Sequence, residues 1–150
     1  MSGMAKISVF AFMLGLGSCG GKQQTTEEQA AAKLSEARSA LAAKEYGRAR
    51  TAILELRRSF PTALAARRAA ILTLDSVEML ESHDSICYYE PLLTAARQRL
   101  ATLEDNPDGR ADSTYIAQRI AVFKMEQHFD ELCAKTRFFR RKLDIDINSM

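Results

Sequence analysis

Two histidines and three cysteines are the residues of this chain with the most obvious chemistry. His83 and Cys87 lie four residues apart, so on a helix they would share one face and could begin a zinc site. His128 and Cys133 lie five residues apart, which places them about 140° apart around a helix. We therefore interpret the histidines as surface residues and expect no metal and no cofactor. The sequence also shows no catalytic Ser-His-Asp set and no glycine-rich phosphate loop, so we expect no enzymatic activity.

The third cysteine, Cys19, ends a segment that is typical of an export signal. Lys6 supplies a positive start, residues 7–16 are an apolar run, and Gly17 and Ser18 are the small residues that a signal peptidase accepts. A membrane-spanning helix needs about 20 apolar residues. This run is shorter, and the sequence GGKQQ at residues 20–24 ends it.

The four residues Leu16-Gly17-Ser18-Cys19 resemble the lipobox of bacterial lipoproteins. The resemblance implies that residues 1–18 are removed as a signal peptide and that Cys19 carries lipid. Radiolabelled palmitate would then be incorporated at Cys19. More than one acyl chain gives stable anchoring. Gly20 stands where an aspartate signals inner-membrane retention in the family, so the resemblance implies the outer membrane. The alternatives are a plain secretory signal with a coincidental cysteine, or a short buried helix.

Composition favours one all-α domain after this signal. The chain has 150 residues, with 7 Gly, 3 Pro and no Trp, and its abundant Ala, Leu, Arg and Glu favour helix. A formal net charge of +2 gives no support to a nucleic-acid partner, which usually requires a strongly basic surface. Residues 19–29 are rich in Gly, Gln and Thr, so we expect a flexible linker there.

Residues 30–62 have the periodicity of two helices joined by a turn. Apolar residues recur at helical spacing in both halves: Leu34, Ala37 and Leu41, then Ala49, Ile53 and Leu56. The intervening turn and Pro61 resemble the second half of a tetratricopeptide repeat, with Tyr46 as the aromatic and Ala49 as the small residue where helices cross. Ala37 matches the crossing position of the first helix, whereas Ala40 stands where a tyrosine is usual. The resemblance implies a TPR-like hairpin that binds peptides or partner helices; the alternative is a generic helical hairpin.

Residues 63–147 predict a long antiparallel helical hairpin with its turn at residues 105–111. The first helix alternates three- and four-residue apolar spacings, as a coiled coil does, through Tyr89, Leu92, Ala96, Leu100 and Leu103. Pro91 lacks a backbone N–H, so we expect a kink or a restart near Ser85. The Asn-Pro and Asp-Gly pairs within residues 105–109 are strong turn signals.

The second helix of this hairpin carries two apolar stretches. Ile116, Ile120 and Phe123 share one face, and after a phase shift near Gln127 the contact continues through Phe129, Leu132, Thr136, Phe139 and Leu143. With the turn at residues 105–111, Tyr89 should lie near Phe129 and Leu92 near Met125.

The same register places Cys87 opposite Asp130, about one helical turn from Cys133. Disulfides persist in exported proteins. If Cys19 carries lipid, Cys87 and Cys133 are the two cysteines that remain free to form one. We therefore predict a disulfide between Cys87 and Cys133. Two buried free thiols are the alternative, because a Cα separation above about 7 Å would prevent the bond.

Two surface groups are candidates for partner binding. The last helix ends in a basic, aromatic segment that could contact anionic headgroups, cell-wall polymer or an acidic partner, or could simply be a solvated arginine face. Its arginines are Arg137, Arg140 and Arg141, beside Phe138, Phe139 and Lys142. The other group is the concave side of the TPR-like hairpin, with Tyr46, Arg38 and Arg48 nearby. We interpret Glu81 and Asp84 as solvated carboxylates.

Together these patterns predict an all-α lipoprotein, anchored in the outer membrane and facing the periplasm. We expect it to act as a protein–protein interaction or scaffold module for an unknown envelope protein. The alternative is a structural envelope spacer or cell-wall tether that self-associates as a homo-oligomer.

Overall fold

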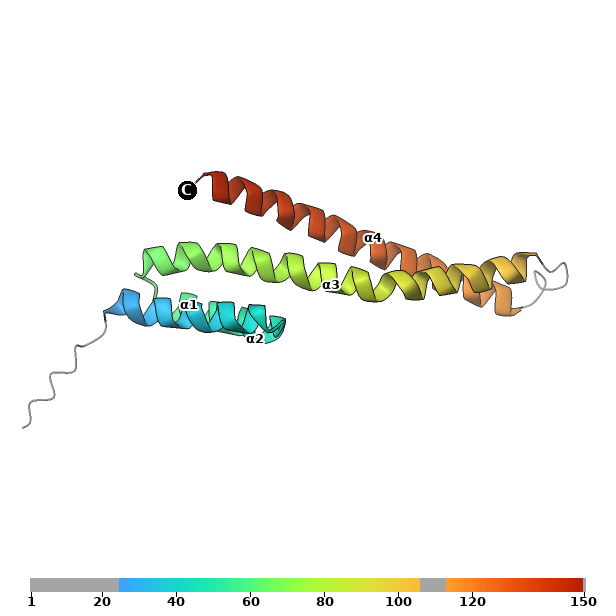
Figure 1. Ribbon diagram of the computed structural model, residues 1–150. Helices are drawn as coiled ribbons and strands as arrows, with labels where there is room; N and C mark the ends of the chain where they lie inside the picture. The colour runs from blue at the N-terminus through green and yellow to red at the C-terminus, as the bar shows by residue number, and fades with distance from the viewer. Residues whose placement is uncertain (1–24, 106–112, 150) are drawn as a thin grey trace, which may run out of the picture.

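The computed structural model describes residues 25–105 and 113–149, and these residues form an all-α structure (Figure 1). The helices are α1 (Thr26–Ala42), α2 (Tyr46–Ser59), α3 (Leu64–Glu104) and α4 (Ser113–Asn148). The predicted signal peptide, Cys19 and the first part of the predicted linker lie outside the described residues, as does most of the predicted turn at residues 105–111.

Helix α1 begins at Thr26, so the prediction of a flexible linker as far as residue 29 was wrong for its last residues. A capping box starts the helix. The amide of Glu28 donates to Thr25 Oγ1 at 3.2 Å, and the amide of Thr25 donates to Glu28 Oε2 at 2.8 Å. These two bonds satisfy backbone donors that would otherwise lack a partner at a helix start. A second carboxylate contact joins this end to α3, because the amide of Ala66 donates to Glu27 Oε1 at 2.7 Å.

Helices α1 and α2 form a hairpin that α3 completes. Alanines such as Ala37 and Ala49 are fully buried where the helices cross, and Ile53 and Leu56 fill the space between them. Ala66, Ala70 and Val77 of α3 close the same core. The turn between α1 and α2 needs a left-handed residue, and Lys44 supplies it with a φ of 60°.

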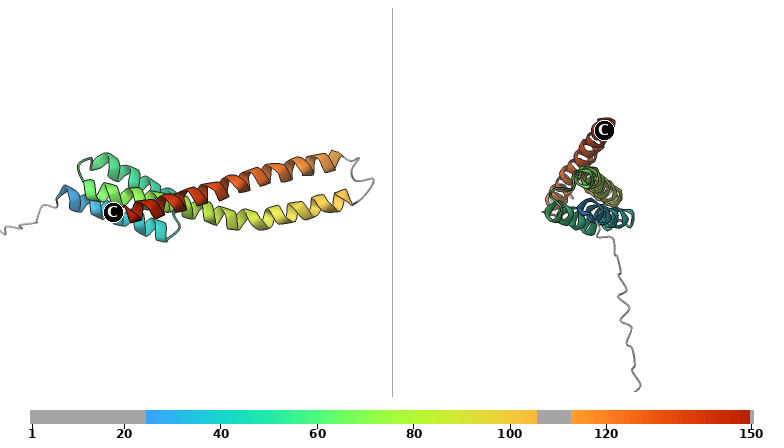
Figure 2. Two further views of the ribbon diagram at one scale, coloured as in Figure 1. Left: turned by 90° about the horizontal axis from the view of Figure 1, so that it is seen from above. Right: turned by 90° about the vertical axis from the view of Figure 1, so that its left-hand side faces the viewer.

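Helices α3 and α4 run antiparallel and form a narrow hairpin whose tip extends well beyond α1 and α2 (Figure 2). The 41 residues of α3 correspond to a length of about 60 Å. The helix continues through Pro91, so the restart expected near Ser85 does not occur. Pro91 is exposed and removes a single backbone donor, which a helix of this length tolerates.

The contact between α3 and α4, here called the seam, has the expected register. The ring of Tyr89 packs 4.8 Å from that of His128, one residue from its predicted neighbour. The phase differs from the prediction in two places. In α3, Leu93 is buried in the seam and Leu92 is exposed. In α4, Val122 is buried in the seam, whereas the predicted contact residues Ile116, Ile120 and Phe123 are exposed.

Candidate functional site

Four carboxylates recur every three residues along α3, which packs against α2 and against α4. This carboxylate row consists of Asp75, Glu78, Glu81 and Asp84. Every member of the row accepts a hydrogen bond from a side chain outside α3. The row therefore joins the first hairpin to α4, and the prediction that Glu81 and Asp84 are merely solvated was wrong.

Glu78 is the centre of the row because it binds a cation on each side. Arg50 of α2 donates to Glu78 Oε1 through Nε at 2.9 Å and Nη2 at 2.6 Å, and Lys135 of α4 lies 2.7 Å from Oε2. Arg50 also reaches Glu81 Oε2 at 2.6 Å. Burial on its own would raise the pKa of Glu78, but the hydrogen bonds from Lys135 and Arg50 outweigh it and hold this pKa below its ordinary value.

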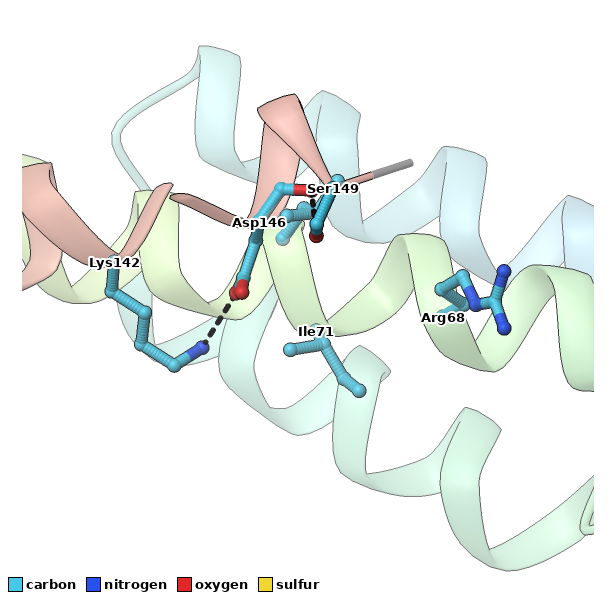
Figure 3. Close-up of a pocket in the computed structure, with 6 residues that line it drawn as sticks. Arg68, Ile71, Lys142, Asp146 and Ser149 are labelled. Carbon is cyan, nitrogen blue, oxygen red and sulfur yellow. Dashed lines mark hydrogen bonds and ion pairs between the residues drawn. The ribbon is translucent and has the colours of Figure 1, made fainter. Parts of the chain in front are cut away.

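Asp75, the most deeply buried carboxylate of the row, pairs with Lys142 near the end of α4. The hydrogen bond to Asp75 raises the pKa of Lys142 above its ordinary value, and Asp146 adds a second ion pair at 3.1 Å. Figure 3 shows the lysine and Asp146, which with Ile71 are among the residues of α3 and α4 that line an open hollow. Lys142 therefore points inward, whereas the sequence placed it on the basic surface of this helix.

The opposite end of the row borders a second open hollow, here called the Tyr46 hollow. Tyr46 donates from its hydroxyl to Asp84 Oδ2 at 2.6 Å, and Lys44 lies 2.9 Å from the same oxygen. Burial and this hydrogen bond raise the pKa of Tyr46 to about 12. The hydrogen bonds from Tyr46 and Lys44 lower the pKa of Asp84. The hollow measures about 540 Å³ and is lined by Arg38, Leu41, Ala42, Lys44, Tyr46, Leu80, His83 and Asp84.

The structure brings some of the predicted binding residues together and separates others. Arg38 and Tyr46 both line the Tyr46 hollow. Arg48 is not among its lining residues, and its Nη1 lies 3.0 Å from Glu45 Oε2. The three arginines predicted on α4, Arg137, Arg140 and Arg141, are all exposed.

Cys87 and Cys133 are free thiols, so the predicted disulfide is not formed. Cys87 is exposed, with its Sγ 4.0 Å from His83 Nδ1 on the same helix face, whereas Cys133 is half-buried. The two thiols therefore occupy different environments although the register brings them within a few residues of each other. Among residues 25–105 and 113–149, no group of three or more His, Cys, Asp or Glu side chains is arranged to hold a metal ion.

The carboxylate row could have been found from the sequence. Asp75, Glu78, Glu81 and Asp84 form a three-residue repeat of acids, which turns by about 60° at each step, so Asp75 and Asp84 lie on opposite sides of the helix. Extended along the hairpin, the register that pairs Cys87 with Asp130 also puts Lys142 opposite Asp75, and Lys135 about one helical turn from the position opposite Glu78. The interpretation of Lys142 as part of a basic surface overlooked this. Arg50 carries no comparable signal, because its position depends on how the two hairpins pack.

No protein-family model matches this chain, and no curated protein or solved structure matches it either. In the part of the chain that the structure describes, no helix combines the length and apolar character needed to cross a bilayer. The site is thus defined by its own geometry, which is a charged row that holds helices together and an open hollow at its end.

Proposed function

We propose that this chain is a lipid-anchored outer-membrane lipoprotein that faces the periplasm and binds a partner protein through the Tyr46 hollow. The observation that carries the binding part is the composition of that hollow. Its floor is apolar, since Leu41 is half-buried and Leu80 is 37% exposed. Arg38 at its rim is exposed and forms no ion pair with any described residue.

The charges around the hollow favour an acidic, partly apolar segment as the bound group. Asp84 is already neutralised by Lys44 and hydrogen-bonded to Tyr46, so it adds little repulsion. Arg38 then remains as a cation available to a carboxylate of the partner. The hydroxyl of Tyr46 is occupied, so its ring serves as a fixed wall for apolar contact.

The resemblance to a tetratricopeptide repeat supports the same proposal. Ala37 and Ala49 are fully buried at the crossing of α1 and α2, as the small residues of such a repeat are expected to be. Units of this kind are stabilised by stacking on a neighbour, and α3 packs against both helices in the manner of the next helix of an array. Proteins built from such repeats bind peptides or partner helices.

The lipobox-like residues Leu16 to Cys19 support the anchor. The capped start of α1 at Thr25 follows Cys19 by so few residues that the fold would sit within about 20 Å of the lipid, even on a fully extended chain. A partner held in the Tyr46 hollow would then also lie near the membrane.

The anchor is tested by radiolabelled palmitate and the hollow by partner capture. We expect label on the full chain and none on Cys19→Ser. For capture from detergent-solubilised envelope, we expect a stoichiometric protein bound by the wild-type chain and lost with Arg38→Glu. The matched control is Arg57→Glu, which reverses another exposed arginine of the same hairpin. Equal capture by the Arg38 and Arg57 variants would contradict the assignment of the hollow.

A structural spacer or cell-wall tether is a second candidate, favoured by the length of α3 and by the exposed arginines of α4. A rod of about 60 Å gives reach without requiring a pocket. Co-sedimentation with purified cell wall that is lost with Arg140→Glu, while partner capture is absent, would favour this function over the first.

A further inference from the structure

The outer face of α4, which points away from α3, carries large apolar side chains that the seam does not use. Near the start of the helix, Ile116, Ile120 and Phe123 are 58%, 51% and 58% exposed. Near its end, Phe138 and Ile145 are 60% and 66% exposed. These residues share one side of the helix, since they fall near-integral numbers of turns apart.

The outer face is one stripe and not two unrelated patches. Between its apolar ends, Gln127, Glu131 and Ala134 continue it at three- and four-residue spacings, and all three are exposed. Helix α4 makes no contact with α1 or α2, and Figures 1 and 2 show it on the outside of the structure. Nothing in the described part of the chain therefore covers this stripe.

The order of residues along the stripe is self-complementary when a second α4 lies against it in the opposite direction. Around a centre between Asp130 and Glu131, Phe123 falls opposite Phe138 and Ile116 opposite Ile145 of the other copy. A two-fold axis makes each of these contacts occur twice, as an isologous interface requires. We propose that two copies of this chain associate through the outer faces of α4, packed antiparallel.

The charges beside the stripe lie close to the same alignment. Around its centre Arg119 and Arg137 fall opposite positions 142 and 124, so Asp144 and Glu126 of the second copy each lie two residues away, about 3 Å along the helix axis. Glu126 already pairs with Arg97 of its own copy at 2.8 Å. Neither Arg119 nor Arg137 forms an ion pair with any described residue of its own copy, and the carboxylate of Asp144 is also unpaired there. These contacts favour the antiparallel register over a parallel one, which would place like residues side by side.

The middle of the stripe explains why a second copy fits better than a lipid surface. Asp130 and Glu131 lie at the centre, between apolar ends about 22 Å apart from Phe123 to Phe138. A helix that lies on a bilayer presents a continuous apolar face with basic flanks. In the dimer Asp130 and Glu131 of both copies, four carboxylates in all, lie near the axis, where their mutual repulsion makes the association weaker than the apolar ends alone would give. The dimer requires neither the lipid anchor nor the Tyr46 hollow.

Disulfide trapping in the full chain tests the register. In a Cys87→Ser and Cys133→Ser background that keeps Cys19, we expect the double variant Gln127→Cys with Ala134→Cys to form a disulfide-linked dimer on mild oxidation. Within one copy these positions are about 10 Å apart along the helix, too far for an internal bond. Each single variant should cross-link at least tenfold less, because residue 127 faces residue 134 and not itself. The background chain controls for dimers formed through Cys19.

Two further changes test the contacts. Ile120→Glu should reduce trapping at least tenfold, whereas Leu54→Glu, at an equally exposed leucine of α2, should not. Arg119→Glu and Asp144→Arg should each reduce trapping and together restore it. Within one helix these residues lie about 37 Å apart, so only an antiparallel neighbour can couple them. Unchanged helical circular dichroism shows that each variant is folded.

The absence of trapping in the double variant, trapping that survives Ile120→Glu, or failure of the charge exchange to restore it would each overturn the dimer. If Ile120→Glu releases the chain from phosphatidylglycerol vesicles while trapping never occurs, the outer face of α4 binds lipid and the dimer is wrong.

Discussion

Replacing Glu78 with glutamine tests whether the carboxylate row stabilises the fold. The change keeps the shape of the side chain but removes its charge, and it turns an amide donor toward either Arg50 or Lys135. Glu78 is 19% exposed and accepts three short bonds from these cations. Hydrogen bonds to charged groups contribute about 1.5–3 kcal/mol each in favourable cases. Arg50 keeps Glu81 and Lys135 is partly solvated, so we expect a net loss of about 1–3 kcal/mol at neutral pH.

The pH dependence of this loss gives a second criterion. The pKa of Glu78 is lowered in the folded protein, so its contribution is present above its ordinary value of 4.5 and disappears as the pH falls through the lower folded value. The wild-type chain should therefore exceed Glu78→Gln in free energy of unfolding at pH 7, and the difference should shrink below about pH 4.5. Urea unfolding followed by circular dichroism at several pH values measures both quantities.

A matched substitution separates this effect from the general loss of a carboxylate. Glu55 is 53% exposed and pairs with Lys33 at 2.7 Å on the surface. Glu55→Gln should change stability by less than about 0.5 kcal/mol, as exposed pairs usually do. Equal stability of wild type and Glu78→Gln at pH 7, or a loss that is the same at pH 3 and pH 7, would refute the role assigned to the row.

Three further predictions concern the core, the cap and a tyrosine. Leu56→Ala, in the large core of α1, α2 and α3, should lower the free energy of unfolding in urea by about 3–5 kcal/mol. Leu93→Ala, in the small seam cluster, should lower it by about 2–3 kcal/mol, because the space left by the side chain can collapse. A larger loss for Leu93→Ala than for Leu56→Ala would contradict this description of the two cores. Thr25→Ala should destabilise by about 1 kcal/mol, seen as a lower melting temperature, and no shift would mean that the capping box is not formed. In ultraviolet titration, one of the four tyrosines should ionise only near pH 12, and Tyr46→Phe should remove that step; its persistence in Tyr46→Phe would assign it to another ring.

The helices and their register could be predicted because they depend on spacing along the sequence. Apolar periodicity and a strong turn signal determine which residues of an antiparallel hairpin meet, and the contact of Tyr89 with His128 confirms this to within one residue. The tetratricopeptide character of the first hairpin, the lipid anchor and the binding function remain predictions.

The face that α4 turns toward α3 could not be predicted, because both sides of this helix are apolar near its start. Ile116 and Ile120 form as good a stripe as Val122 and Met125, and periodicity alone does not say which one packs. The helix places Tyr115 and Gln118 in the seam, where Gln118 Nε2 donates to the carbonyl of Ala96 at 3.3 Å. Because Gln118 is polar, the apolar pattern of α4 did not indicate the side of the helix that faces α3.

The start of α1 was missed for a different reason. The low apolar content of residues 19–29 predicts a linker, but a helix start is stabilised by polar caps, and Thr25 with Glu28 supplies one. The ionic contacts between the first hairpin and α3 could not be predicted, because they depend on how the two hairpins pack. Only the part that lies between α3 and α4 was implied by the hairpin register.

Both ends of the described chain, residues 25 and 149, lie at the same end of the rod, and α4 touches only α3 (Figure 2). A force applied between these ends would therefore peel α4 from α3 one turn at a time, starting at Leu143, instead of sliding the two helices past each other. Peeling breaks few contacts at once, so α4 should detach under a small load while the alanine-rich core around Ile53 remains folded.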